Sequence, residues 1–427
     1  MEETPKDIKS RYLSRPDIKK QFDLLGEVID EGQKRVDWET AHDEEVLRAI
    51  GVVERFLRKK HRLCYGGQAI NSLLPMKHQF YDRRYTIPDY DFFTPELEED
   101  TKEIITMLQE EGFADVNYRV GIHEGTHKIN VNFVAVADIT EMHPEAFKVL
   151  SKRAPKVDGI SYCDPDYLRM NMHLELSRPR GQVDRWKKVY ERLMLLNRAY
   201  PMESCSDTLV VKKGVNAEDR KDILSFCLSN KRPLAGIEAI AMLEKQRGVV
   251  HRDTLIKIGG PVIFFSPNAK VDAEDIRDRL SNQKTIHIQE LPGLTDDLLS
   301  FVAMYRGSKP LALIAQETAC HAYTHLRLDT GEEMRISLHD TLMHFYYNLV
   351  LFGKKEKAFF ESSLDCLVKK LYTITKQARE SPTKFVPAFG LRCSGRQKGM
   401  KTLRKERQKR TEEEKRKIKK TRKNKNY

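Results

Sequence analysis

The sequence predicts an α/β fold built from two related units in tandem, followed by a basic tail. Three observations predict it. Strand-like segments alternate with amphipathic helical segments, the second half repeats short stretches of the first, and the excess positive charge lies at the C-terminal end. The chain has 427 residues, enough for two or three domains, and 40% of them are hydrophobic, so a substantial core can be buried.

The first unit is expected over residues 41–200, after a polar helical lead-in over residues 1–40. Over 43–60 the apolar residues recur with the period of a helix and fall on one face. In chain order we then expect a strand over 62–65, a helix over 68–74, an extended segment over 85–93, a helix from Thr94-Pro95 to about Glu111, a strand over 128–138, and helices starting at Tyr167 and Val183.

The second unit, expected over residues 201–390, repeats three stretches of the first in the same order. The matched stretches are 62–73 with 232–243, 92–95 with 264–267, and 160–164 with 336–340. One such match is expected by chance, but three at a slowly drifting offset indicate a duplication. The positions that correspond to Asp89 and Asp91 are Pro261 and Ile263. The second copy is therefore predicted to keep the fold and to lack these acidic residues.

The positive charge is concentrated in the predicted tail, residues 391–427. From Arg392 onward there are 17 Lys or Arg and 4 Glu, a net charge of +13, which leaves −1 for the preceding residues of a chain whose total is +12. Such a segment attracts polyanions and releases them as salt rises. We expect a disordered tail that serves nucleic-acid binding or localisation; the simpler interpretation is a solubilising end.

The cysteines and the N-terminus predict the compartment. The seven cysteines are odd in number, widely spaced and without a Cys-x-x-Cys, which argues against a disulfide framework or zinc ribbon and favours a reducing compartment. The first residues are polar and acidic, unlike a secretory signal, and no apolar run approaches the roughly 20 residues of a membrane helix. A soluble, intracellular protein without membrane contact is expected.

The candidate chemistry lies in a Gly-Gly turn and an Asp-x-Asp pair. Gly66 and Gly67 stand between a predicted strand and helix, where the backbone can approach a triphosphate and helix amides favour anions. Asp89 and Asp91 are spaced to point the same way from one strand. With a third carboxylate they would hold two Mg²⁺ ions about 3.5–4 Å apart, which activate an attacking 3′-hydroxyl and stabilise leaving pyrophosphate.

The third carboxylate is predicted to be Asp138, because it ends a strand expected beside the Asp-x-Asp strand. Glu141, beyond that strand, and Asp115, in the loop before it, are the alternatives. The order strand, Gly-Gly, helix, Asp-x-Asp, helix, strand with Asp is much more restrictive than either short motif alone.

These stretches resemble the catalytic subunits of poly(A) polymerases from large cytoplasmic DNA viruses, which belong to the DNA polymerase beta-type nucleotidyltransferases. The resemblance extends over about 43–197. It rests on Cys-Tyr-Gly-Gly-Gln-Ala-Ile-Asn at 64–71, Ile-Pro-Asp-Tyr-Asp-Phe-Phe at 87–93, Val-Ala-Asp-Ile-Thr at 136–140, Leu-Glu-Leu-Ser-Arg-Pro at 174–179, and the helix that begins Arg-Trp at 185.

The resemblance implies template-independent addition of AMP from ATP to an RNA 3′ end, with two Mg²⁺ or Mn²⁺ ions per active site. It also implies a second, inactive nucleotidyltransferase-like domain, and either a homodimer, as in giant-virus relatives, or a separate processivity subunit, as in poxvirus relatives. A host-cell cytoplasmic or virion location follows from it. The alternatives are a terminal nucleotidyltransferase acting on tRNA or a small molecule, and a non-catalytic RNA-binding protein.

Further candidate binding residues surround this core. Gln68 follows the Gly-Gly turn, and Ser177 and Arg178 offer groups that suit phosphate oxygens of the nucleotide. Arg185, Lys188 and Arg192 share one helix face and are predicted to line an RNA or triphosphate channel, although an ordinary amphipathic surface helix has the same pattern.

A second cluster, in the second half of the chain, has metal-ligand residue types. Cys320, His321 and His325 have a spacing compatible with zinc, and His339 and His344 follow, but no fourth ligand is clearly placed. We expect a chance cluster.

Overall fold

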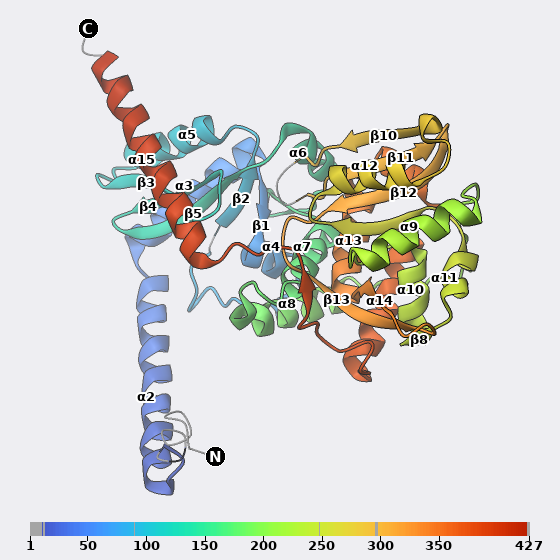
Figure 1. The fold of residues 1–427 in the computed structure, drawn as a ribbon. Helices are drawn as coiled ribbons and strands as arrows, with labels where there is room; N and C mark the ends of the chain where they lie inside the picture. Colours follow the sequence, from blue (N-terminus) through green and yellow to red (C-terminus); the bar gives the residue numbers. More distant parts are fainter. Residues whose placement is uncertain (1–10, 12, 89, 247, 295–297, 425–427) are drawn as a thin grey trace.

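The protein is described here by a computed structural model that covers residues 11, 13–88, 90–246, 248–294 and 298–424, with side chains up to Arg416. It is a mixed α/β fold, as predicted, with helices packed on mixed sheets (Figure 1). The helix α2, Pro16–Ala41, projects from the body. No helix among the described residues has the length and apolar character needed to span a membrane.

The first sheet has seven strands in the order β3-β4-β5-β2-β1-β7-β6. β2 is parallel to β5 and antiparallel to β1, and β1 is parallel to β7. The strands are β1 Leu63–Tyr65, β2 Tyr90–Thr94, β3 Val116–Val120, β4 Thr126–Val131, β5 Val134–Glu141, β6 Lys156–Val157 and β7 Ile160–Tyr162.

The helices predicted around this sheet are present, whereas the helix Pro144–Ser151 was not predicted. Asp43 caps α3 by accepting hydrogen bonds from the amides of Glu45 and Val46, and the apolar face of α3 is buried against the sheet. The helices are α3 Glu44–Lys60, α4 Gly66–Leu73, η1 Met76–His78, α5 Leu97–Glu110, α6 Pro144–Ser151, α7 Pro165–Leu176, η2 Val183–Arg185 and α8 Trp186–Ala199.

The single strand predicted over 128–138 is wrong. The chain forms a hairpin of β4 and β5, because Asn132 and Phe133 both adopt positive φ, 47° and 68°, in a two-residue turn. Asp138 therefore lies in the middle of β5 and does not end a strand.

The second half contains a sheet of similar topology. Its strands run β10-β11-β12-β9, and Leu234 continues the order by bridging β9 to β14, which pairs with β13. As in the first sheet, the central pair β9 and β12 is parallel. The strands are β8 Val249–Val250, β9 Val262–Ser266, β10 Ile286–Leu291, β11 Phe301–Arg306, β12 Lys309–Gln316, β13 His321–Leu328, β14 Glu333–Ser337 and β15 Cys393–Ser394.

The helices of this half cover the second sheet and join it to the first half. They are α9 Ala217–Ser229, α10 Ile237–Glu244, α11 Arg252–Ile258, α12 Ala269–Arg279, η3 Gln283–Thr285, α13 His339–Phe352, η4 Lys355–Phe359 and α14 Leu364–Glu380. α13 is almost entirely buried and packs along α7 of the first half. At this contact His173 of α7 lies 2.9 Å from Asp340 of α13, which also binds Arg379 of α14 at 2.7 Å.

One ion pair recurs at matching places in both halves. Arg62, just before β1, donates two hydrogen bonds to Asp100 of α5 at 2.6 and 3.0 Å. Arg232 donates two to Asp272 of α12 at 2.6 and 2.9 Å. These positions correspond in the offset of the sequence repeat. The domain limits at residues 40, 200 and 390 stay a prediction.

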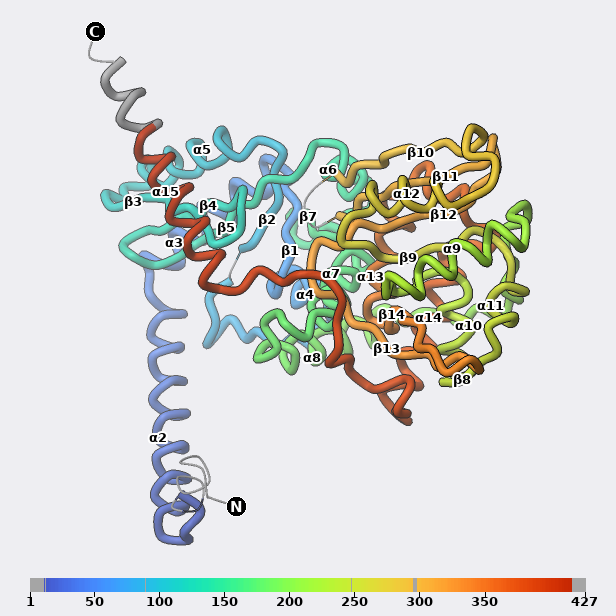
Figure 2. The backbone as a smooth tube through the Cα atoms, in the orientation of Figure 1, coloured from blue at the N-terminus to red at the C-terminus, as the bar shows by residue number. Residues whose placement is uncertain are grey.

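The tail differs from the predicted disorder. Residues Met400–Asn424 form the helix α15, and the chain after α14 crosses back to the first sheet to reach it (Figure 2). The segment is rich in strong helix formers, and side-chain pairs such as Gln408 with Glu412 support it. The prediction of disorder rested on charge alone, which takes no account of the surface on which such a helix docks.

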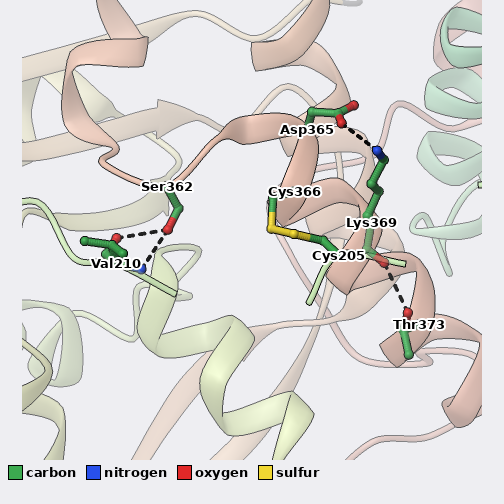
Figure 3. The surroundings of a disulfide bond; sticks show 7 residues. All are labelled: Cys205, Val210, Ser362, Asp365, Cys366, Lys369 and Thr373. Carbon is green, nitrogen blue, oxygen red and sulfur yellow. Dashed lines mark hydrogen bonds and ion pairs between the residues drawn. A yellow bond between two sulfur atoms is a disulfide. The ribbon is translucent and has the colours of Figure 1, made fainter. Parts of the chain in front are cut away.

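The cysteine interpretation is also wrong, since the structure has two disulfides. Cys205 is bonded to Cys366 and Cys320 to Cys393, across 161 and 73 residues of sequence. Figure 3 shows the first, which joins the segment after α8 to α14, near hydrogen bonds between Val210 and Ser362. Spacing could not reveal these pairs because only the tertiary fold brings their partners together.

Candidate active site

The first sheet places two predicted carboxylates side by side. Asp91 of β2 and Asp138 of β5 are partners in register on neighbouring parallel strands, so their side chains leave the same face of the sheet. Asp89, the other member of the predicted Asp-x-Asp pair, lies outside the described residues. Of the alternatives, Glu141 pairs with Thr94, three residues further along β5 and on the opposite face. Asp115 lies before β3 and accepts from the Asn117 side chain. The register favours Asp138.

A cation already accompanies Asp138. The ammonium of Lys128, on β4, forms an ion pair with the Asp138 carboxylate. The register continues outward from Lys128 to Arg119 on the edge strand β3. The row Arg119, Lys128, Asp138, Asp91 therefore crosses four strands on one face and changes from basic to acidic. Lys128 was not predicted as a site residue from the sequence, although residues two apart on a strand, such as Lys128 and Asn130, lie on the same face.

The Gly-Gly turn lies directly against Asp91. Gly66 opens α4 with φ +72°, and a Cβ there would lie 2.5 Å from Asp91 Oδ2. Only glycine combines this conformation with this close approach. The first amides of α4 therefore begin beside the Asp91 carboxylate, an arrangement that suits an anion bridged to Asp91 by a cation.

Gly67 is in contact with a guanidinium. A Cβ on Gly67 would lie 2.6 Å from the Tyr81 hydroxyl and 2.8 Å from an Arg192 nitrogen, and Arg192 donates to that hydroxyl at 2.5 Å. Asn71 of α4 holds the loop by accepting from the amides of Phe80 and Tyr81. The long stretch between Gly67 and the Asp-x-Asp pair thus folds back over α4 and seats Tyr81 beside the turn. Nothing in the sequence marked Tyr81 for this place.

Gln68, the third residue of the turn, is buried, and its side chain donates to Ser72 at 3.1 Å. Both line a cavity of about 670 Å³ with Asn71 and Tyr90.

The remaining predicted contacts divide into two groups. Ser177 is fully buried, and its hydroxyl donates to the Leu174 carbonyl, so it supports α7 and exposes no oxygen to a nucleotide. Arg178, Arg185 and Arg192 all act electrostatically on Glu175, whose pKa is raised by burial against their opposing effect. Lys188 is exposed on α8. The structure therefore gathers all three predicted arginines around Glu175, whereas it buries the Ser177 hydroxyl.

The second cluster has no zinc-binding arrangement among the described residues. Cys320 is bonded to Cys393, and His325 lies 3.2 Å from Glu333. The one described group with mutually close ligand atoms is Cys205, Asp207 and Cys366, of which two form a disulfide.

Comparison with known proteins finds similarity in this part of the chain. Residues 51–182 match the family model described as the poly(A) polymerase catalytic subunit. The match contains the Gly-Gly turn, Asp91, Lys128 and Asp138, so the predicted resemblance is confirmed.

Individual relatives agree with the family match. An African swine fever virus protein (strain Badajoz 1971, Vero-adapted), named provisionally as a poly(A) polymerase catalytic subunit, is 33% identical over 168 residues, 38% of this chain and 35% of that protein. A protein of Acanthamoeba polyphaga mimivirus with the same name is 35% identical over 161 residues, 36% of this chain and 26% of that protein. The matched region thus spans about a third of the curated relatives or less.

The fold extends the likeness to most of the chain. The crystal structure of the Megavirus polyadenylate synthase superposes with a TM-score of 0.73 and 19% sequence identity, covering 91% of this chain and 82% of that one. At this identity the likeness concerns the fold alone.

Proposed function

We propose that this protein is a template-independent poly(A) polymerase that transfers AMP from ATP to RNA 3′ ends. The observation that supports it best is the register of Asp91 and Asp138 beside the Gly66 turn, within the segment that matches the family model. A buried pair of apolar residues, Ile263 and Leu313, stands at the corresponding place in the second sheet. We therefore assign catalysis to the first half and infer that the second half is a degenerate nucleotidyltransferase-like domain.

The acidic site fits divalent cations. Asp91 and Asp138 present hard carboxylate oxygens from one rigid sheet, and the ammonium of Lys128 already occupies a cation position beside Asp138. With Asp89 they would hold two Mg²⁺ or Mn²⁺ ions, which supply activation of the 3′-hydroxyl and charge stabilisation at the leaving pyrophosphate.

The other groups of this chain bind and orient the triphosphate. The amides at the start of α4 would donate to the phosphates, and the glycines would allow the close approach. Arg192, held by Tyr81, adds a positive charge next to Gly67, where the departing pyrophosphate gathers negative charge. The transfer then depends on positioning and electrostatics rather than on covalent chemistry by the protein.

The partners follow from this assignment. RNA and ATP are the substrates, and a homodimer or a processivity subunit completes the enzyme. Exposed apolar side chains along the projecting helix α2 support such an association; they include Phe22, Leu25, Val28, Ile29 and Val36, each more than half exposed. We place the protein in the host cytoplasm or the virion.

The test is a nucleotide-by-nucleotide extension assay. Purified protein receives a labelled RNA, Mg²⁺ or Mn²⁺, and each NTP in turn, with Asp138→Asn as the control. A long ladder with ATP alone supports the proposal. Addition of one or a few residues, or use of several NTPs, favours a different terminal nucleotidyltransferase. No extension in either metal leaves the RNA-binding protein as the better hypothesis.

A further inference from the structure

We propose that the outer face of α15 binds the sugar-phosphate backbone of the RNA strand whose 3′ end enters the acidic site. This rests on the proposed function, because it assigns a role in substrate binding to the C-terminal helix. In both views of the backbone α15 lies at the β3 side of the first sheet (Figures 1 and 2).

The inner face of α15 is anchored on the catalytic half. Arg407 and Arg410 donate to the carbonyls of Val120 and Ile122, each at 2.9 Å, at the end of the edge strand β3. Tyr118 of β3 donates to Glu414 at 3.0 Å. The helix thus covers an edge strand that would otherwise present unpaired backbone groups. A helix fixed in this way holds its outward side chains in a defined place.

The outer face of the first turns of α15 is a basic stripe, which the exposed Glu412 and Glu413 follow. Lys401, Arg404, Lys405 and Lys409 are exposed, follow helical spacing, and extend over about 12 Å along the axis. Between Met400 and Arg416 every exposed side chain of α15 other than Met400 is charged or polar. This face therefore offers point charges for phosphates and little apolar area for a protein interface.

The edge strand that anchors α15 also begins the row of charges that reaches the acidic site. Arg407 bonds the residue next to Arg119, and Arg119 begins the row that continues through Lys128 to Asp138. Neighbouring strands are about 4.8 Å apart, so two strand spacings, about 10 Å, separate the basic edge from Asp138. The positive charges are thus arranged along a path that ends where the carboxylates would receive the 3′-hydroxyl.

The start of α15 also closes a basic cavity. A space of about 320 Å³ lies between the 397–403 segment and the end of α7, and Arg178, Arg180 and Arg185 line it together with Lys398. The tail and the predicted binding arginines therefore share one positively charged wall.

The test compares two charge-matched variants. The first replaces Lys401, Arg404, Lys405 and Lys409 by Gln; the control replaces four exposed lysines of the second half by Gln, namely Lys213, Lys221, Lys245 and Lys257. Binding of a labelled 20-nucleotide RNA is measured by fluorescence anisotropy across a salt series without ATP. We expect affinity to fall about tenfold or more and the salt slope to decrease by roughly 0.7 for each lost phosphate contact in the first variant alone.

A third variant tests the anchoring. Arg407→Ala with Arg410→Ala leaves the outer stripe intact but frees the helix, and we expect intermediate loss of RNA affinity. The inference is overturned if the four-residue α15 variant binds RNA with wild-type affinity and salt slope, if the control loses as much, or if the wild type binds no RNA at low salt. If the wild type extends no RNA but the α15 variant still loses RNA binding, the polymerase proposal is refuted. The inference that α15 binds RNA then stands without it.

Discussion

Asp91 and Asp138 face the same side of the first sheet from paired positions on β2 and β5. Neither depends on a loop for its placement, so their separation is fixed by the hydrogen-bonded strands themselves. The ammonium of Lys128 balances one of the two charges from the next strand, β4. The predictions below start from this arrangement.

Asp138→Asn should lower ATP-dependent RNA extension by about 10³-fold or more, because it removes a ligand charge while preserving shape. The melting temperature should change little. Glu141→Gln, on the opposite face of the same strand, is the control and should retain activity. Extension rates and thermal melts check both, and equal losses in the two variants would exclude Asp138 as the third carboxylate.

Lys128→Met should tighten Mn²⁺ binding in the absence of nucleotide. The Lys128 ammonium competes with a metal for Asp138, and at a partly exposed site this competition is on the order of 1 kcal/mol, about fivefold in Kd. Titration calorimetry measures it directly, with Lys102→Met on α5 as the control. Unchanged or weaker Mn²⁺ binding in Lys128→Met would contradict the competition.

Gly66→Ala should abolish extension and destabilise the fold, since the new Cβ would meet Asp91 Oδ2 in a backbone conformation with φ +72°. Gly112→Ala is the matched control: its φ is +97°, but no atom lies within 4 Å of the added Cβ. Both should lose about 1 kcal/mol from backbone strain. Only Gly66→Ala should lose transfer activity; if Gly112→Ala loses it equally, the contact with Asp91 is irrelevant.

The histidines buried in the second half should make stability depend on pH. Burial lowers the pKa of His321 well below its usual value, that of His339 to about 4 and that of His344 to about 3. The unfolded chain binds protons to these groups below pH 6.5 and the folded chain does not. Their contribution to the free energy of unfolding is therefore complete above pH 6.5. It is lost at about 1.4 kcal/mol per pH unit for each histidine as the pH falls toward the pKa of that histidine in the folded state.

This effect is isolated by comparison between variants, because other groups titrate in the opposite sense. Burial raises the pKa of Glu175, Glu238 and Glu317, which stabilises the fold as pH falls. Between pH 7 and 5 the melting temperature should fall less in His344→Phe than in the wild type. The exposed-site variant His287→Gln should behave like the wild type. Parallel curves for His344→Phe and wild type would contradict the proton linkage.

Reduction should destabilise the second half more than the first. The Cys205–Cys366 bond closes a loop with a sequence separation of 161 residues, and such bonds contribute about 2–5 kcal/mol. Cys205→Ser should lower the melting temperature under non-reducing conditions. Adding reductant should then lower the melting temperature less in this variant than in the wild type, because the variant has no Cys205–Cys366 bond to lose. Cys227→Ser, at a buried free thiol, is the control, and mass spectrometry of alkylated protein checks the pairing. Six or more alkylated cysteines in unreduced, unfolded protein would refute both disulfides.

Sequence reasoning reached Asp91, Asp138 and the Gly-Gly turn because these residues lie on short, regular elements whose side-chain directions follow from local periodicity. It erred at the β4–β5 turn, since two non-glycine residues at positive φ leave no Gly or Pro signal in the sequence. It missed Lys128 and Tyr81, whose roles depend on a neighbouring strand and on a loop folding back. Ser177 was selected by residue type alone, and its burial under β13 had no local signal.

The sequence by itself determined the α/β class, the positions of most helices in the first half and the repeated stretches. These follow from hydrophobic periods and composition, which act over a few turns or strands. Only the tertiary structure decided that Asp91 and Asp138 stand in register, that Cys205 and Cys366 meet, and that the basic tail docks as a helix on β3. Such contacts join residues far apart in the chain, and their free energy depends on a surface that exists only once the rest has folded.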